Sequence, residues 1–174
     1  HPVQRRRPAR AVHVNGPGAW RTGIVLSALL AAMNLLAGIS GGLARLGLPT
    51  PAAAIGAHGA VLACGFFGTL IALERAVALR RLAGLVAPLA AGLGGLLAWA
   101  VGVPAAAQLS WGVAAATLVG LYVHAGCSRA WSVPLVVELC GALCWGVGTA
   151  GWALGDLAAG VTGWMAFLVL TIAA

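Results

Sequence analysis

One histidine of this chain lies inside a long apolar run, which makes it the first candidate for chemistry. His58 stands in IGAHGAVLACGFFGTLIALERAVAL, where no charged residue precedes Glu74. An imidazole in hydrocarbon is costly unless it is partnered, and the neutral ring is a good ligand for haem iron or copper. Gly59 beside it allows a flat macrocycle or another helix to come close. The alternative is that His58 only packs, through a hydrogen bond to a neighbouring helix.

A second histidine, His124, ends another apolar run and is predicted at the opposite membrane boundary. A helix from residue 52 places His58 roughly 9 Å below the outer boundary, at about 1.5 Å of rise per residue. The two histidines are then roughly 15–20 Å apart along the membrane normal, so they cannot bind one iron. His124 is therefore interpreted as a solvated interfacial side chain.

The carboxylate of Glu138 is expected inside a span, where an unpaired charge is unfavourable. Arg75, Arg129 and His124 are expected on the same side of the membrane, which predicts an ion pair. The alternative is a proton relay through Glu138 and His124. Asn34, in the middle of the first apolar run, is expected to hydrogen-bond to another helix.

Six apolar runs, each near the roughly 20 residues that span a bilayer, must position these side chains. Lipid offers no hydrogen-bond partners, so each run is expected to be a helix. The predicted fold class is all-α, a polytopic transmembrane helical bundle of about six helices. Residues 1–20, rich in Arg, Pro and Gly, are predicted to form a flexible basic tail before a transmembrane domain of residues 21–174. The helices are expected at about 22–44, 52–73, 82–102, 105–125, 133–154 and 158–174.

Composition excludes an ordinary soluble protein, because 61% of the residues are hydrophobic and only 7% are charged. Lipid is therefore the expected surrounding, and no nucleic-acid partner is expected. Basic residues in short loops mark the cytoplasmic side. We place the N-terminus on the cytoplasmic side, which leaves one arginine, Arg45, on the outer side. The sequence therefore predicts a multipass protein of the cytoplasmic (inner) membrane. The nine arginines expected inside are Arg5, Arg6, Arg7, Arg10, Arg21, Arg75, Arg80, Arg81 and Arg129.

The last apolar run stops at Ala174 without a polar flank. Its 17 residues (158–174) are at the short end of the range of about 17–25 that spans a bilayer. We therefore expect the natural chain to continue beyond this residue.

One block of sequence carries a specific motif. Residues 42–81 read GLARLGLPTPAAAIGAHGAVLACGFFGTLIALERAVALRR, with an RLG turn, then HG, then GFFGTLIALERAVAL. This block resembles a bacterial membrane-protein group that is similar to NnrS-type haem- and copper-containing membrane proteins and, more remotely, to subunit I of the haem-copper oxidases. GALCWGVGTAGW (141–152) and WMAFLVLTIAA (164–174) also resemble parts of that group.

The resemblance implies that His58 matches a histidine that ligates haem in an HG context. The oxidase pattern often has Met a few residues later, where this chain has Val61, Leu62 and Ala63. The histidine cluster of an oxidase copper site is also absent, so copper is disfavoured relative to haem. A second axial ligand would have to come from a further C-terminal part of the chain or from another membrane subunit, or the iron would have none.

Three functions remain open at this point. The first is haem or metal binding through His58, with a role in nitric oxide or respiratory redox metabolism. The second is a proton-coupled small-solute transporter that uses Glu138 and His124. The third is a structural or assembly subunit without a cofactor. Catalysis by side chains alone is not expected, because no nucleophile or phosphate-binding motif occurs, but whether the chain is an enzyme stays open.

Overall fold

The computed structural model describes residues 17–50 and 54–174, and every regular element in that part of the chain is helical. Five helices are long and apolar enough to cross a membrane, and the last is shorter. The predicted all-α transmembrane helical bundle is thus confirmed. The elements are α1 (Pro17–Arg45), α2 (His58–Ala60), η1 (Val61–Phe67), α3 (Gly68–Leu79), η2 (Leu82–Leu85), α4 (Val86–Leu96), η3 (Leu97–Val101), α5 (Pro104–Arg129), α6 (Val133–Ala153) and α7 (Leu157–Ala173).

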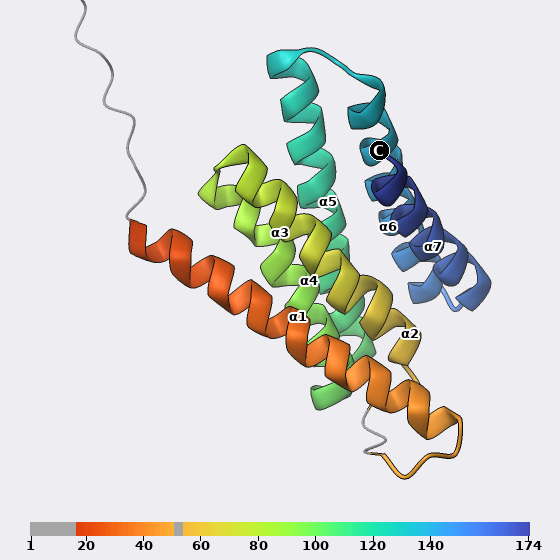
Figure 1. Ribbon diagram of the computed structural model, residues 1–174. Helices are drawn as coiled ribbons and strands as arrows, with labels where there is room; N and C mark the ends of the chain where they lie inside the picture. The colour runs from red at the N-terminus through yellow and green to blue at the C-terminus, as the bar shows by residue number, and fades with distance from the viewer. Residues whose placement is uncertain (1–16, 51–53) are drawn as a thin grey trace, which may run out of the picture.

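Successive helical segments run in alternating directions, so the bundle has two ends (Figure 1). The first, here called the arginine-rich end, holds the joints at 80–82 and 130–132 together with the start of α1. The second, the His58 end, holds the joints at 102–103 and 154–156 and the described residues 46–50 and 54–57. Among the described arginines, Arg45 lies at the His58 end, and Arg21, Arg75, Arg80, Arg81 and Arg129 lie at the other. Arg5, Arg6, Arg7 and Arg10 lie outside the described residues.

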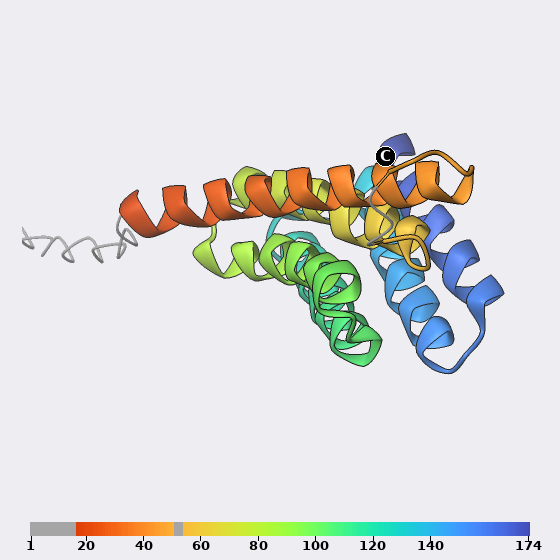
Figure 2. The same ribbon diagram turned by 90° about the horizontal axis from the view of Figure 1, so that it is seen from below.

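Large side chains at the centre of the bundle are packed around helix α5. Trp111, Tyr122, Trp145 and Phe167 are fully buried or nearly so, and Trp145 stacks on Phe167 at 4.7 Å between ring centroids. Seen along the other direction, α6 and α7 form a pair at one side of the bundle (Figure 2). The α6–α7 pair approaches closely where Gly148 meets Gly163, because a Cβ on Gly163 would lie 2.6 Å from the Gly148 Cα atom.

The polar side chain of Asn34 joins α1 to the α4–η3 segment. Its Nδ2 donates to the Gly92 carbonyl oxygen at 2.9 Å, and its Oδ1 accepts from Trp99 Nε1 at 3.1 Å. The predicted interhelical hydrogen bond of Asn34 is thus confirmed. Gly92 and Gly95 allow this approach, since a Cβ on either would meet α1 side chains at 2.6 Å or less.

Several predicted boundaries differ from the structure, including the ends expected at residues 73 and 125, where the helices continue to Leu79 and Arg129. The predicted tail of residues 1–20 is helical from Pro17 onward, because proline suits the first turn of a helix, where its missing N–H costs nothing. Residues 1–16 lie outside the described residues. The second helix, expected from residue 52, begins at His58. A turn closed by Ala57 N–H and the Ala54 carbonyl oxygen at 3.0 Å comes before it.

The later start of this helix also changes the position of His58 within it. The prediction had this residue about one and a half turns inside the helix, roughly 9 Å from its start. In the structure His58 is the first residue of α2, so its ring lies at the end of the bundle. Gly56, a poor helix former, and the preceding turn delay the start of the helix.

Candidate functional site

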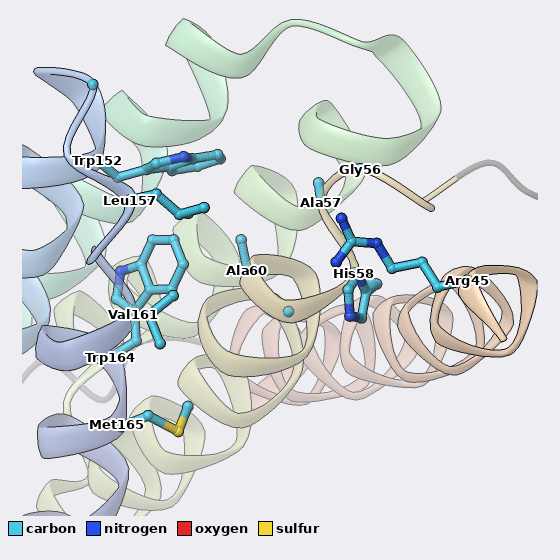
Figure 3. Close-up of a pocket in the computed structure, with 12 residues that line it drawn as sticks. Arg45, Gly56, Ala57, His58, Ala60, Trp152, Leu157, Val161, Trp164 and Met165 are labelled. Atoms are coloured by element: carbon cyan, nitrogen blue, oxygen red, sulfur yellow. The ribbon is translucent and has the colours of Figure 1, made fainter. Parts of the chain in front are cut away.

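A cavity of about 410 Å³ lies at the His58 end, between the start of α2 and the α6–α7 hairpin. Figure 3 shows Arg45 and His58 on one side and the side chains of Trp152, Leu157 and Trp164 on the other. Its size is that of an ordinary small-molecule site. The lining residues are Arg45, Gly56, Ala57, His58, Gly59, Ala60, Trp152, Gly155, Leu157, Val161, Trp164 and Met165.

The imidazole of His58 is half-buried and held by its own turn and by α1. Its Nδ1 lies 3.3 Å from the carbonyl oxygen of Ile55. A carbonyl oxygen only accepts, so Nδ1 carries the proton in this contact and the lone pair of the neutral ring lies on Nε2. Within the described residues Nε2 has no hydrogen-bond partner. Histidines that bind metal are commonly oriented in this way, by a hydrogen bond from the other ring nitrogen to a backbone carbonyl.

The end of α1 leaves space for this ring. Gly42 lies against it, and a Cβ there would be 3.6 Å from His58 Cδ2. Gly56 and Gly59 line the cavity, and a Cβ on either would meet no atom within 4 Å. The backbone around His58 is therefore open enough for a flat group to come close to the ring.

Tryptophans from two helices lie in the opposite wall, and a third tryptophan packs against them. Trp152 of α6 and Trp164 of α7 meet edge to face at 5.3 Å, and Trp111 of α5 stacks on Trp152 at 5.8 Å. Trp164 is almost fully buried, and its Nε1 donates to Thr149 Oγ1 at 3.3 Å. These contacts fix the rings, so this wall is rigid and aromatic.

The charge of the cavity is positive. Arg45 is always protonated and exposed, and its guanidinium presents five N–H donors. None of the described lining residues is acidic. A ligand that combines a flat apolar body with a negatively charged group would match this combination of walls.

The structure also pairs two other predicted residues, at the opposite end. Arg75 of α3 forms an ion pair with Glu138 of α6, whose side chain is only 6% exposed. Arg75 lies 3.9 Å from Glu74 as well, although Glu74 is largely in solvent. This contact ties the end of α3 to the start of α6.

His124 does not join that pair. It is exposed on α5, and its Nε2 lies 3.3 Å from Ser128 Oγ on the same helix. Two positions earlier, Tyr122 faces the interior, which shows that His124 is on the outer face of α5. The two residues of the predicted relay, Glu138 and His124, are therefore not brought together. His58 and His124 lie at opposite ends of the bundle, as the spacing predicted (Figure 1).

Sequence reasoning missed the partners of His58 in this cavity. Arg45 served only to orient the chain, and neither Trp152 nor Trp164 was predicted at this site. The sequence does indicate that each pair could lie together, because Arg45 and His58 lie on either side of one loop and Trp152 and Trp164 lie on either side of the α6–α7 turn. Nothing in the sequence, however, indicates that the two loops lie beside each other.

Comparison with known proteins identifies a family and no characterised relative. A family model described as "Domain of unknown function (DUF8744)" matches residues 23–174. No curated protein and no solved structure matches the chain.

Proposed function

The chain belongs to the DUF8744 family, a domain of unknown function, and from its own residues we propose that it binds haem through His58. It is a multipass integral membrane protein, with five helices long and apolar enough to span a bilayer. The observation that carries the proposal is the placement of His58, which lines a cavity of about 410 Å³ with an aromatic wall and whose Nε2 has no hydrogen-bond partner within the described residues.

A single histidine suits haem better than it suits a bare metal ion. The porphyrin supplies four nitrogen ligands, so one axial histidine from the protein is enough to hold the iron. A bare zinc or copper ion needs three or four protein ligands. In residues 17–50 and 54–174 no group of three or more His, Cys, Asp or Glu side chains is placed to supply them. Copper is therefore less well supported than haem.

The other walls of the cavity suit the same group. Trp152 and Trp164 offer flat apolar surface for a macrocycle, and Arg45 offers a positive charge for its carboxylates. Bound haem would supply ligand binding or electron transfer at its iron, and the resemblance to NnrS-type proteins favours a role in nitric oxide or respiratory redox metabolism.

The test is an absorption spectrum of the full chain, purified in detergent from cells supplied with a haem precursor. We expect a Soret band that is lost in His58→Ala and kept in His124→Ala, a matched control because His124 is exposed and outside the cavity. Elution as a single species and unchanged helix content would show that both variants fold. A colourless parent protein, or an unchanged band in His58→Ala, would rule the proposal out.

A further inference from the structure

A second cavity, of about 310 Å³, lies at the arginine-rich end between α3, α5 and α6. It is separate from the His58 cavity, which is at the other end of the bundle. Apolar residues such as Leu79 and Leu135 form part of its wall. Its polar lining consists of Arg75, Tyr122, Arg129, Ser132 and Glu138.

The hydroxyl of Tyr122 is the first sign that something binds there. Tyr122 is 1% exposed, and within the described residues its buried hydroxyl has no hydrogen-bond partner. Buried polar groups are nearly always paired, because an orphaned one loses its bonds to water without replacement. Tyr122 lines the cavity, so an acceptor atom held there could satisfy its O–H.

The charges around the cavity leave a positive excess. Arg75 and Glu138 neutralise each other, whereas Arg129 forms no ion pair with any described residue. Glu74, the other acid nearby, is 73% exposed and does not line the cavity.

The start of α6 adds to this positive excess. Ser132 caps the helix by accepting from the Leu135 N–H at 3.4 Å, and the positive end of the helix dipole therefore faces the same region. The cavity thus presents donors and positive charge, which are what an oxyanion requires.

We propose that this cavity binds a phosphate group, with Arg129 and the Tyr122 hydroxyl as its donors. Glu138 acts by holding the Arg75 guanidinium at the wall. The joints at this end lie where lipid headgroups are expected, so the phosphate belongs either to an anionic phospholipid or to free inorganic phosphate; the chemistry of the contact is the same.

The test measures the midpoint of thermal unfolding of the full chain in detergent. Inorganic phosphate and mixed micelles containing phosphatidylglycerol are added separately, with phosphatidylcholine micelles as the control. A ligand that binds only the folded state raises the midpoint. A shift with phosphate alone would identify a soluble ion, and a shift only with phosphatidylglycerol would identify a headgroup; both support the site. No shift with either probe would overturn it.

Two variants distinguish this site from a general attraction of anions to arginine. Arg129→Gln should weaken binding by at least about tenfold, the usual effect of losing a charge-assisted hydrogen bond. Arg81→Gln is the matched control, because Arg81 is an exposed arginine at the same end but outside the cavity. Equal losses in the two variants would contradict a specific site.

Tyr122→Phe gives a readout that a purely structural role would not. Without ligand the variant should unfold at a higher temperature than the parent protein, since it removes an orphaned polar group and keeps the ring. With ligand its shift should be smaller. A variant that is stabilised without ligand but keeps the full shift would show that the hydroxyl is not a donor to the anion, and would overturn its assigned role. His58→Ala should keep the full shift, so this site can fail or succeed independently of haem binding.

Discussion

The ion pair between Arg75 and Glu138 is asymmetric, because its two members differ in their access to solvent. The Glu138 side chain is 6% exposed, whereas that of Arg75 is 30% exposed and also lies 3.9 Å from Glu74. Removing the arginine leaves a buried carboxylate alone. Removing the carboxylate leaves an arginine that still has Glu74 and some water.

We therefore expect Arg75→Met to be more damaging than Glu138→Gln. Breaking a buried pair costs about 3–5 kcal/mol, so Arg75→Met should lower the free energy of unfolding by about 3 kcal/mol. Glu138→Gln should lower it by about 1 kcal/mol, since the amide still accepts a hydrogen bond. Thermal unfolding in detergent measures both, with Glu74→Gln as the exposed control that should change little. Equal losses in the two pair variants would contradict the asymmetry.

At the scale of the elements, α1 is held to the α4–η3 segment by contacts too close for larger residues. A Cβ on Gly95 would lie 2.5 Å from Asn34 Cγ, and the Asn34 amide is fixed by its bonds to Gly92 and Trp99. The amide cannot move aside without losing them. The packing of these two helices therefore depends on the absence of one methyl group.

Two glycine-to-alanine substitutions on different helices should thus have different effects on the free energy of unfolding. Gly95→Ala should lower the free energy of unfolding by about 2 kcal/mol, because it forces Asn34 away from buried partners. Gly120→Ala on α5 should be neutral or stabilising by up to about 1 kcal/mol, since a Cβ there meets nothing within 4 Å and alanine is the better helix former. The unfolding midpoints of the two variants test this. If Gly95→Ala were as stable as Gly120→Ala, the close approach of α1 would be refuted.

At the scale of the whole molecule, an apolar exterior and a few buried polar side chains suit a lipid surrounding. Ser27, Asn34, Thr69 and Glu138 are buried, whereas large apolar side chains such as Leu36 are exposed. The ends also differ in charge, with Arg45 alone among the described arginines at the His58 end. By the positive-inside rule, the arginine-rich end should face the cytoplasm.

Thiol labelling of membrane vesicles can test this orientation. Cys127 is exposed near the arginine-rich end, and Leu46, 78% exposed, lies at the other. In right-side-out vesicles an impermeant thiol reagent should label Leu46→Cys at once and Cys127 only after permeabilisation. Each is tested in a chain whose other cysteines are replaced by alanine. The reverse pattern would invert the topology.

The sequence alone determined the class of the fold and much of its topology. In lipid the backbone must satisfy its own hydrogen bonds, so six long apolar runs had to become helices. The predicted ranges of those runs also located the joints approximately. The same reasoning predicted correctly that Asn34 would bond across helices and that Glu138 needed a basic partner, because a buried polar group must be paired wherever it lies.

Only the tertiary structure decided which of these groups meet. Local pattern could not select Arg75 over His124 as the partner of Glu138, since that choice depends on how α5 is rotated about its axis. Nor could it show that Arg45 and His58 face Trp152 and Trp164, which are more than 90 positions further along the chain. The start of α2 at His58 was set by the turn before it. The sites are made by contacts between helices, and a one-dimensional pattern of hydrophobicity specifies each helix but not its neighbours.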